Sequence, residues 1–498
     1  MNDALAELRR RLGEVSDLRS AAAVLDWDQM VKMPPAGAAV RAERLATLER
    51  VAHEAFTDER VGSLLEQLRP LEGSLPPDSD DASLIRVARR DYDKAVRVPS
   101  ALAAEITKAA SEGMEAWVAA RAANDYDAFR PWLDRHLELK RRYVDCFETA
   151  DDPYDVLLDD YEPGTTTAET RAVFDRLKEQ LVPLIAEVAS DEDDSFMRGP
   201  FSEDGQRALS LEAMTAFGFD PESFRLDVAV HPFCTHFATS DIRVTTRYQE
   251  HDLESLFSSM HEIGHGVYER GVSPALERTP LATGCSSGLH ESQSRLWENV
   301  VGRSLPFWRW FYPRAQATFP DVLGDVPLES FHRAVNRVRP SFIRVDADEV
   351  TYGLHIILRF ELEQELLSGA LSTADLPEAW NARFARFFGL EVPEPRLGVL
   401  QDVHWSAGAF GYFPTYQLGN VMSVQIWEAA RAALPDLDEQ FEQGDFSALG
   451  EWLRESLYAL GRKLTPKETL ERVAGAPLDP EPYLRYLREK YGAGVAAL

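Results

Sequence analysis

The chain has 498 residues, with 53 lysine and arginine residues against 83 aspartate and glutamate residues, a formal net charge of −30. So acidic a balance argues against nucleic acid or an anionic membrane as a partner, because both bind proteins through basic faces. The hydrophobic content of 45% and the charged content of 27% are those of an ordinary soluble globular protein. No lysine lies between Lys178 and Lys463, so a central site that needs a positive charge must use arginine, histidine or a metal ion.

Most of the chain is predicted to be helical, because apolar residues recur at intervals of three and four positions. These helical stretches cover residues 3–24, 36–70, 98–149, 253–267 and 290–299. Polar residues predict loops at 73–82 and 190–205. Alternating residues at 224–230 and 242–246, with a turn near 240–241, predict a small sheet or hairpin, and we expect 242–246 to be an edge strand that pairs with extended substrate.

The pattern indicates one soluble body rather than a chain of independent domains, because no strong linker interrupts it. No apolar run approaches the ~18–20 residues of a membrane span, and the first residues lack the apolar core of a signal peptide. Cys146, Cys234 and Cys285 are too few for a disulfide framework and lack zinc-knuckle spacing. We therefore expect a cytoplasmic protein.

The most informative motif is His261-Glu262-Ile263-Gly264-His265, which lies within the predicted helix 253–267. Its two histidines are one turn apart on the same helix face, so both can bind a single metal ion. A pair of buried helix histidines without a metal is the alternative interpretation. A catalytic zinc also needs a third protein ligand and an open position for water.

The third ligand must come from another segment, because the position six residues after His265 is Gly271. The predicted helix 290–299 offers Glu291 near its start, with Glu298 and His290 as rivals. Spacing alone does not decide among the three.

The chain resembles the thermostable carboxypeptidase Taq family, whose members are metallocarboxypeptidases with a His-Glu-x-x-His helix. Several motifs of this family occur in the chain in the family's order. Further family-like segments are Trp27-Asp28, Met33-Pro34, Tyr154-Asp155 and 161–164. The motifs that carry the resemblance over the whole chain are 231–233, 241–245, 261–265, 290–293, 343–348 and 398–405.

The resemblance implies a mostly α-helical fold, distantly similar to the angiotensin-converting enzyme and neurolysin group. Residues 1–498 would form a single catalytic domain, with two helical halves on either side of a deep substrate groove, a small β-sheet next to the metal site, and the N-terminal helices in one wall. It also implies a cytoplasmic homodimer that removes single residues from peptide C-termini. Its specificity would be broad, with C-terminal proline released poorly.

The resemblance implies metal ligands at His261, His265 and Glu291. Zinc suits such ligands best, and cobalt or manganese can replace it. Glu262 lies next to a ligand and would act as general base and then general acid during hydrolysis. For the oxyanion donor, Tyr416 is the first choice and Tyr412 the second.

An exopeptidase must also bind the free carboxylate of its substrate, for which a planar guanidinium is suited. The candidates are Arg243, Arg247, Arg295, Arg344 and Arg359. The resemblance favours Arg344; an ion pair of Arg344 with Asp346 or Asp348 is the structural alternative. We interpret Arg243 and Arg295 as structural residues, with Arg295 facing Glu291 or Glu298 one turn away.

Two histidines complete the predicted site. His231 would hydrogen-bond a substrate carbonyl by analogy with the converting-enzyme group, or would simply be a packing residue. His404 would contribute to the substrate pocket or support another residue there, as would Asp402. The rival functions are an oligopeptidase with the same chemistry and a non-catalytic helical peptide-binding protein.

Overall fold

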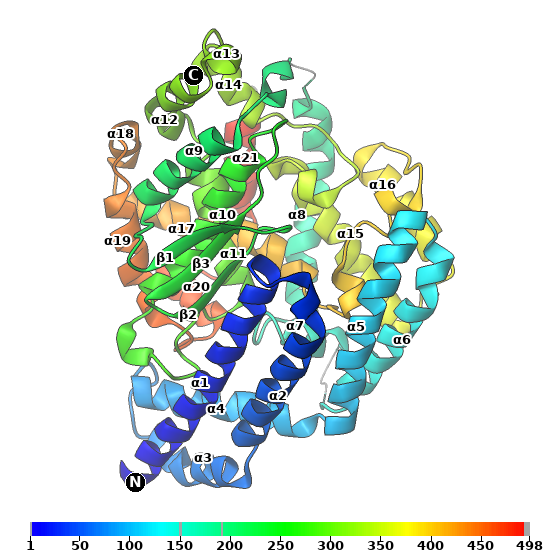
Figure 1. Cartoon of the computed structure of the whole chain (residues 1–498), viewed down its shortest axis with the longest axis vertical. Helices are drawn as coiled ribbons and strands as arrows, with labels where there is room; N and C mark the ends of the chain where they lie inside the picture. Colours follow the sequence, from blue (N-terminus) through cyan, green and yellow to red (C-terminus); the bar gives the residue numbers. More distant parts are fainter. Residues whose placement is uncertain (1, 149–151, 191–192, 493–498) are drawn as a thin grey trace. The chain divides into compact units, whose positions relative to one another are not determined.

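The computed structural model describes residues 2–148, 152–190 and 193–492, and its parts are mostly helical (Figure 1). The chain divides into two compact units. Unit 1 comprises residues 1–96, 193–334 and 423–477, and unit 2 comprises residues 97–192, 335–422 and 478–498. The prediction of a mostly α-helical protein with a small β-sheet is confirmed. Among the described helices, none is both long and apolar enough to cross a membrane.

The helices of unit 1 include the N-terminal helices and the two helices that carry the predicted metal ligands. Their bounds are α1 (Asn2–Val31), α2 (Ala38–Phe56), α3 (Glu59–Glu72), α4 (Asp80–Arg97), α9 (Glu203–Phe217), α10 (Glu254–Gly271), α11 (Ser287–Arg295), α12 (Leu305–Thr318), α13 (Pro320–Leu323), α14 (Leu328–Val335), α18 (Leu437–Glu442), α19 (Ser447–Ser456) and α20 (Pro466–Ala474).

The predicted substrate-binding residues other than His231 lie in unit 2. Its helices are α5 (Ser100–Ala123), α6 (Tyr126–Val144), α7 (Tyr154–Leu158), α8 (Thr167–Val188), α15 (Glu349–Ser368), α16 (Leu376–Phe388) and α21 (Glu481–Tyr491). The helix α17 (Phe413–Ala433) begins in unit 2 and ends in unit 1.

Two long predicted helices are each interrupted by a capping aspartate. The stretch 36–70 is broken where the carboxylate of Asp58 accepts a hydrogen bond from the backbone N–H of Arg60, at 2.8 Å, and starts α3. The stretch 98–149 is broken at Asn124, whose φ of 58° ends α5, and Asp125 then caps α6. Residue 149 and, in the predicted loop 190–205, residues 191–192 lie outside the described residues.

The sheet has three strands, β1 (Phe224–Val228), β2 (Cys234–Ala238) and β3 (Asp241–Thr246), in the order β1-β3-β2. β1 pairs with β3 in parallel, and β2 pairs with β3 in antiparallel orientation. One face packs on α10, where a Cβ added at Gly266 would lie 2.8 Å from the ring of Phe224. On the sheet, Trp27 of α1 contacts the guanidinium groups of Arg225 and Arg243, 5.6 and 4.9 Å from its ring centre.

The prediction that residues 242–246 form an edge strand is wrong. β3 is the central strand, and both of its edges are paired, with β1 on one side and β2 on the other. The sequence pattern did not indicate β2, which supplies the second partner. Because its backbone groups are already used in the ladder, β3 has no free edge to which an extended peptide could add.

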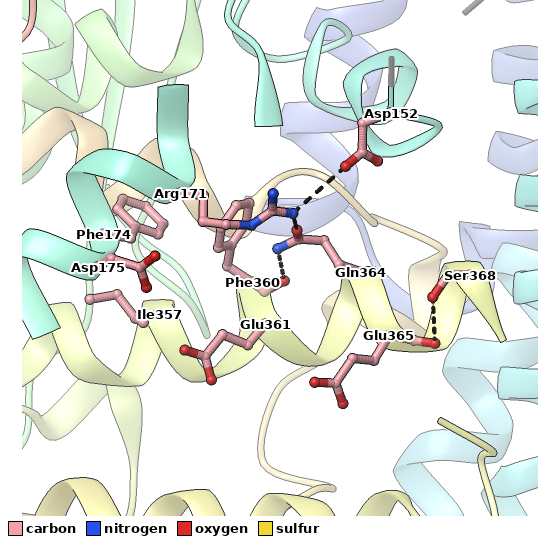
Figure 2. Close-up of a pocket in the computed structure, with 10 residues that line it drawn as sticks. All are labelled: Asp152, Arg171, Phe174, Asp175, Ile357, Phe360, Glu361, Gln364, Glu365 and Ser368. Atoms are coloured by element: carbon pink, nitrogen blue, oxygen red, sulfur yellow. Dashed lines mark hydrogen bonds and ion pairs between the residues drawn. The ribbon is translucent and has the colours of Figure 1, made fainter. Parts of the chain in front are cut away.

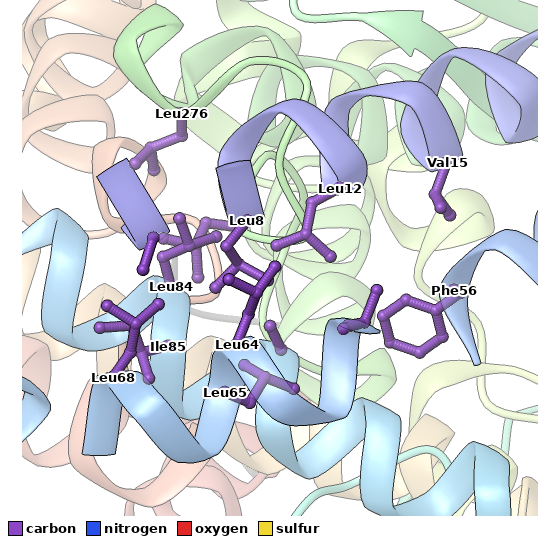
Figure 3. Close-up of a cluster of buried hydrophobic side chains, with 14 of the residues drawn as sticks. Leu8, Leu12, Val15, Phe56, Leu64, Leu65, Leu68, Leu84, Ile85 and Leu276 are labelled. Atoms are coloured by element: carbon purple, nitrogen blue, oxygen red, sulfur yellow. The ribbon is translucent and has the colours of Figure 1, made fainter. Parts of the chain in front are cut away.

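The N-terminal helices share an apolar core with the segment that follows α10. Figure 3 shows Leu8, Leu12 and Val15 of α1 against side chains of α3 and α4, with Leu276 beside them. Val272 and Leu281 belong to the same cluster. Burial of each such side chain contributes about 1.5–3 kcal/mol relative to exposure. This cluster therefore anchors the C-terminal end of the helix that carries the histidine motif.

Candidate active site

The two motif histidines lie on α10 as the spacing predicts. Glu291 comes from α11, which packs against α10. One carboxylate oxygen of Glu291, Oε2, lies 3.6 Å from Nε2 of His261 and 3.5 Å from Nε2 of His265. These three side chains are the group of possible metal ligands found among the described residues. Two imidazole nitrogens and a carboxylate oxygen form a donor set that fits a zinc-type ion and leaves room for a further ligand.

The two rivals for the third ligand lie behind the histidines. Nδ1 of His261 is 2.9 Å from Oε2 of Glu298, and Nδ1 of His265 is 2.6 Å from Nδ1 of His290. Glu298 is placed by a π-helical stretch (Leu296–Val301) that continues α11. Both rivals therefore contact the ring nitrogens that point away from Glu291.

Burial and neighbouring charges set the ionisation of the three groups in the cluster. Burial lowers the pKa of His265 to about 4, which keeps its ring neutral. Burial also opposes protonation of His261, but Glu291 and the hydrogen bond to Glu298 raise its pKa overall. Burial would raise the pKa of Glu291, yet Arg295 and His261 hold it well below its ordinary range. The cluster thus contains an ionised carboxylate between two imidazoles.

Arg295 orients the candidate carboxylate ligand. Its Nε donates to Oε1 of Glu291 at 2.7 Å, and its Nη1 donates to Oε2 of Glu298 at 3.2 Å. This contact occupies the oxygen of Glu291 that does not face the histidines. The structural role predicted for Arg295, with Glu291 and Glu298 as neighbours, is confirmed.

Glu262 is 7% exposed and lies between the two histidines in sequence. Burial raises its pKa to about 7; the charge of His261 opposes this rise, and those of Glu291 and Glu298 add to it. A carboxyl group with a pKa near neutrality can both accept and release a proton, which is what a general acid–base residue must do.

The motif helix and α11 approach each other closely at Gly264. A Cβ at this position would lie 2.6 Å from the backbone oxygen of Gln293 and 2.7 Å from Cα of Ser294, closer than atoms can pack. Only glycine allows the two backbones to meet here, and this contact sets how near Glu291 is to the histidines.

Replacing Gly264 with alanine is therefore expected to force α11 away from α10. We expect a loss of about 1–3 kcal/mol in the free energy of unfolding, from overpacking, together with weaker zinc binding. Thermal unfolding and competition with a metal chelator measure the two effects. The matched control is Gly450→Ala on α19, where an added Cβ meets no atom within 4 Å and should stabilise the helix. Equal zinc affinities for Gly264→Ala and the wild type would contradict the prediction.

Within unit 2, Arg344 belongs to a buried cluster of charges. Its Nε and Nη2 donate to Oδ1 of Asp402 at 3.0 and 2.8 Å, and its Nη1 donates to the Tyr352 hydroxyl at 3.1 Å. Arg359 pairs with the other oxygen of Asp402, with Nε at 2.7 Å. The two arginines and one aspartate carry a net charge of +1. The predicted alternative partners, Asp346 and Asp348, were wrong: the ion pair is with Asp402.

The Arg344 guanidinium has N–H donors beyond those it uses in its contacts with Asp402 and Tyr352. A guanidinium has five N–H donors, and three of those of Arg344 are used in the contacts above. In the described part of the chain, the other two have no protein acceptor. Burial opposes ionisation of Asp402, but Arg344 and Arg359 hold its pKa well below its ordinary range. Asp402 therefore stays charged and orients Arg344.

The other candidate arginines are less suited to bind a carboxylate. Arg359 is 0% exposed, so it is inaccessible to a ligand. Arg243 donates to Asp241 through Nε at 2.6 Å, which confirms its predicted structural role. Arg247 is exposed and contacts the backbone oxygen of Val230 at 3.4 Å.

His404, Tyr412 and Tyr416 also lie together in unit 2. The Tyr416 hydroxyl is 3.2 Å from Nε2 of His404, and the Tyr412 and Tyr416 rings are 5.2 Å apart, edge to face. Arg344 lies 5.0 Å from the centre of the Tyr416 ring. Burial lowers the pKa of His404 to about 4, despite Asp402, so this histidine is neutral.

Sequence reasoning missed the residue that holds this loop. Buried Glu363 on α15 accepts hydrogen bonds from Trp405 Nε1 at 2.8 Å, the Gly411 backbone N–H at 3.0 Å and the Tyr154 hydroxyl at 2.5 Å. Its carboxylate thus ties both ends of the segment between His404 and Tyr412. No local pattern marks such a residue, because its partners are far away in sequence.

His231 lies outside regular structure, in the connection between β1 and β2, and its side chain is exposed. The adjacent Phe233 is fixed by its backbone N–H, which donates to Oγ1 of Thr245 at 2.8 Å. An exposed histidine beside a fixed strand end is accessible to a ligand, and the structure does not show it as a packing residue.

A separate open pocket of about 350 Å³ lies between α8 and α15 of unit 2 (Figure 2). Phe174, Ile357 and Phe360 contribute its apolar part, and charged side chains contribute the rest. Arg171 extends toward Asp152, 3.7 Å away. None of the predicted site residues lines this pocket.

Together, the fold and the cluster on α10 and α11 define a class of protein. A His-Glu-x-x-His helix that meets a glutamate from a second helix, inside a mostly helical chain, is typical of metallopeptidases.

Comparisons with known proteins agree with this class. A family model described as carboxypeptidase Taq (M32) metallopeptidase matches residues 7–491. Thermostable carboxypeptidase 1 of Thermus thermophilus is 41% identical over 493 residues, which cover 96% of each chain. Carboxypeptidase 1 of Bacillus subtilis is 36% identical over 484 residues, also 96% of each chain.

Solved structures agree as well. The M32 carboxypeptidase from Deinococcus radiodurans R1 has a TM-score of 0.95 at 40% identity, covering 99% of this chain and 100% of that chain. The Pyrococcus furiosus carboxypeptidase has a TM-score of 0.95 at 34% identity, covering 99% of both. The chain belongs to the carboxypeptidase Taq (M32) family and is a metallocarboxypeptidase.

Proposed function

We propose that this metallocarboxypeptidase removes single residues from the free C-terminus of peptides, with His261, His265 and Glu291 as the ligands of one divalent metal ion. The observation that supports this proposal most is the convergence of the two Nε2 atoms on Oε2 of Glu291, which lies 3.6 Å from that of His261 and 3.5 Å from that of His265. When bound, a divalent ion at these ligands polarises the substrate carbonyl and makes water more acidic. Zinc suits this donor set best, and cobalt or manganese are alternatives.

Glu262 is proposed as the general base and general acid. Its carboxylate accepts a proton from the attacking water and then transfers it to the departing amine of the released amino acid. The raised pKa of Glu262, about 7 as a result of burial, suits both transfers near neutral pH. Its location in a buried segment of α10 limits exchange of that proton with bulk water.

Arg344 is proposed to bind the terminal carboxylate of the substrate. The support comes from the net charge of +1 in its cluster with Asp402 and Arg359 and from its two N–H groups that have no protein acceptor among the described residues. A carboxylate supplies both the missing charge and two acceptors. Asp402 acts as a positioning residue because it holds Nε and Nη2 of this arginine.

Four further residues complete the proposed site. We propose Tyr416 as the donor to the developing oxyanion, with Tyr412 as second choice, and His404 as a substrate-binding residue that orients the Tyr416 hydroxyl. We propose that His231, which is exposed, hydrogen-bonds a substrate carbonyl. Poor release of proline, a homodimer and a cytoplasmic location stay predictions.

The direct test is to incubate the zinc-loaded protein with an unblocked peptide and to follow the product masses. We expect a ladder in which one C-terminal residue is lost at a time, and we expect amidation of the peptide C-terminus to abolish cleavage. Internal fragments from both the free and the amidated peptide would instead support the oligopeptidase alternative. Membership of a peptidase family argues against the non-catalytic alternative.

A further inference from the structure

We propose that His290 and Glu269 form a hydrogen-bonded relay behind His265 that fixes its protonated nitrogen and so holds it ready to bind metal. This inference rests on the proposed metal-dependent function. It assigns a role to two residues that are not ligands: both are positioning residues that act through His265.

The relay consists of two short contacts in series. Nδ1 of His265 is 2.6 Å from Nδ1 of His290, and Nε2 of His290 is 2.7 Å from Oε1 of Glu269. The two imidazole rings are tilted by 41°, with centres 4.7 Å apart. Tyr268 lies against His290 on another side, with ring centres 5.1 Å apart. His290 is thus held in place by its ring contacts as well as by its hydrogen bonds.

The distances allow only one arrangement of protons when His265 binds metal through Nε2. A neutral imidazole then carries its single proton on Nδ1, which must donate to Nδ1 of His290. Two protons do not fit between nitrogen atoms 2.6 Å apart. Nδ1 of His290 is therefore the acceptor, so the His290 proton lies on Nε2 and is donated to Glu269.

Glu269 is a hydrogen-bond acceptor whose carboxylate stays ionised. Its Oε1 also accepts from the Thr283 hydroxyl at 2.8 Å and the Gly284 backbone N–H at 3.2 Å, and the residue is buried. Its Oε2 lies 3.5 Å from Nε2 of His236 on β2. Burial would raise the pKa of Glu269, but His290 and His236, with Thr283, lower it to about 2. The relay therefore ends in a stable negative charge.

The two candidate histidine ligands are supported differently. His261 contacts the carboxylate of Glu298 directly, and Arg295 and Arg303 share that carboxylate's charge. His265 reaches its carboxylate only through a second imidazole, which can itself exist as two tautomers. The ability of His265 to bind metal therefore depends on which tautomer His290 adopts. The relay selects the His290 tautomer that carries its proton on Nε2.

Three variants test the relay. His290→Phe keeps a ring but removes both nitrogens. Glu269→Gln removes the charge and keeps the shape, because three donors point at Oε1 and favour a carbonyl oxygen there. His236→Gln is the matched control, since it contacts the other oxygen of Glu269 and lies outside the relay.

The principal measurement is zinc affinity by competition with a chelator, with circular dichroism as a check of folding. Supporting residues of this kind typically change metal affinity 10–100-fold when removed. We expect a loss in that range for His290→Phe, about tenfold for Glu269→Gln, and less than about threefold for His236→Gln. In the zinc-loaded wild type, nitrogen NMR should find the His265 proton on Nδ1 and the His290 proton on Nε2.

The outcomes separate the relay from the proposed function. Wild-type zinc affinity in His290→Phe and Glu269→Gln, or a His290 proton on Nδ1, would overturn the relay while the wild type still binds zinc and releases C-terminal residues. A wild type that neither binds zinc nor cleaves peptides would overturn both proposals. If His290→Phe does not fold, the relay is tested by the zinc affinity of Glu269→Gln and by the positions of the His265 and His290 protons in the wild type.

Discussion

Glu262→Gln is expected to retain its zinc while its kcat for peptide hydrolysis falls by about 10³–10⁴-fold, the upper part of the range for general acid–base catalysis. Glutamine has nearly the shape of glutamate but cannot take a proton from water or return one to the amine. The proposed metal ligands His261, His265 and Glu291 are unchanged, so binding of the ion should persist. Metal analysis and single-turnover kinetics on the same preparation measure the two properties.

The matched control for this variant is Glu254→Gln. Glu254 begins the same helix, α10, but is exposed and lies away from the histidine motif in sequence. We expect this control to keep wild-type kcat within about twofold. Wild-type turnover in Glu262→Gln would remove Glu262 from the mechanism. Loss of zinc from Glu262→Gln would show that its main role is to support the ligands.

Arg344→Ala is expected to lower kcat/KM for peptides with a free C-terminus by about 10²–10³-fold. Two hydrogen bonds between charged groups, each worth about 1.5–3 kcal/mol, are lost with the guanidinium. The variant should still fold, because Asp402 keeps Arg359 as an ion-pair partner. The measurement is the ratio of kcat/KM for a peptide acid to that for the same peptide amide.

This ratio should be large in the wild type and fall toward one in Arg344→Ala, because the amide never had the charge that Arg344 binds. Arg243→Ala is the matched control, since Arg243 pairs with Asp241 at the surface of the sheet. The control should keep the wild-type ratio. An equal loss on acid and amide in Arg344→Ala would assign Arg344 a purely structural role with Asp402.

The metal cluster could be anticipated from the sequence because local geometry determines most of it. Helical spacing alone puts His261 and His265 on one face of α10. The same reasoning could have found Glu269, which lies one further turn along that face and now closes the proposed relay. Spacing could not choose among Glu291, Glu298 and His290, because the choice depends on how α11 packs against α10 at Gly264.

Contacts between distant segments could not be anticipated. Asp402 follows Arg344 by 58 residues, so the nearby Asp346 and Asp348 were the natural but wrong partners. β2 was missed because its residues are all half-buried and give no alternation of buried and exposed positions. Without β2, the sequence predicts an edge position for the central strand β3, since a strand's place in a sheet depends on its neighbours rather than on its own residues.

The division of the chain between its two units has a consequence for synthesis on the ribosome. Unit 1 draws its last segment from residues 423–477, and unit 2 draws its last segment from residue 478 onward. That final segment includes α21, where Lys490 and Tyr491 contact Glu349 at 2.8 and 2.7 Å. Unit 1 therefore lacks its last segment until residues 423–477 have been synthesised, and α10 and α11 leave the ribosome well before that segment does.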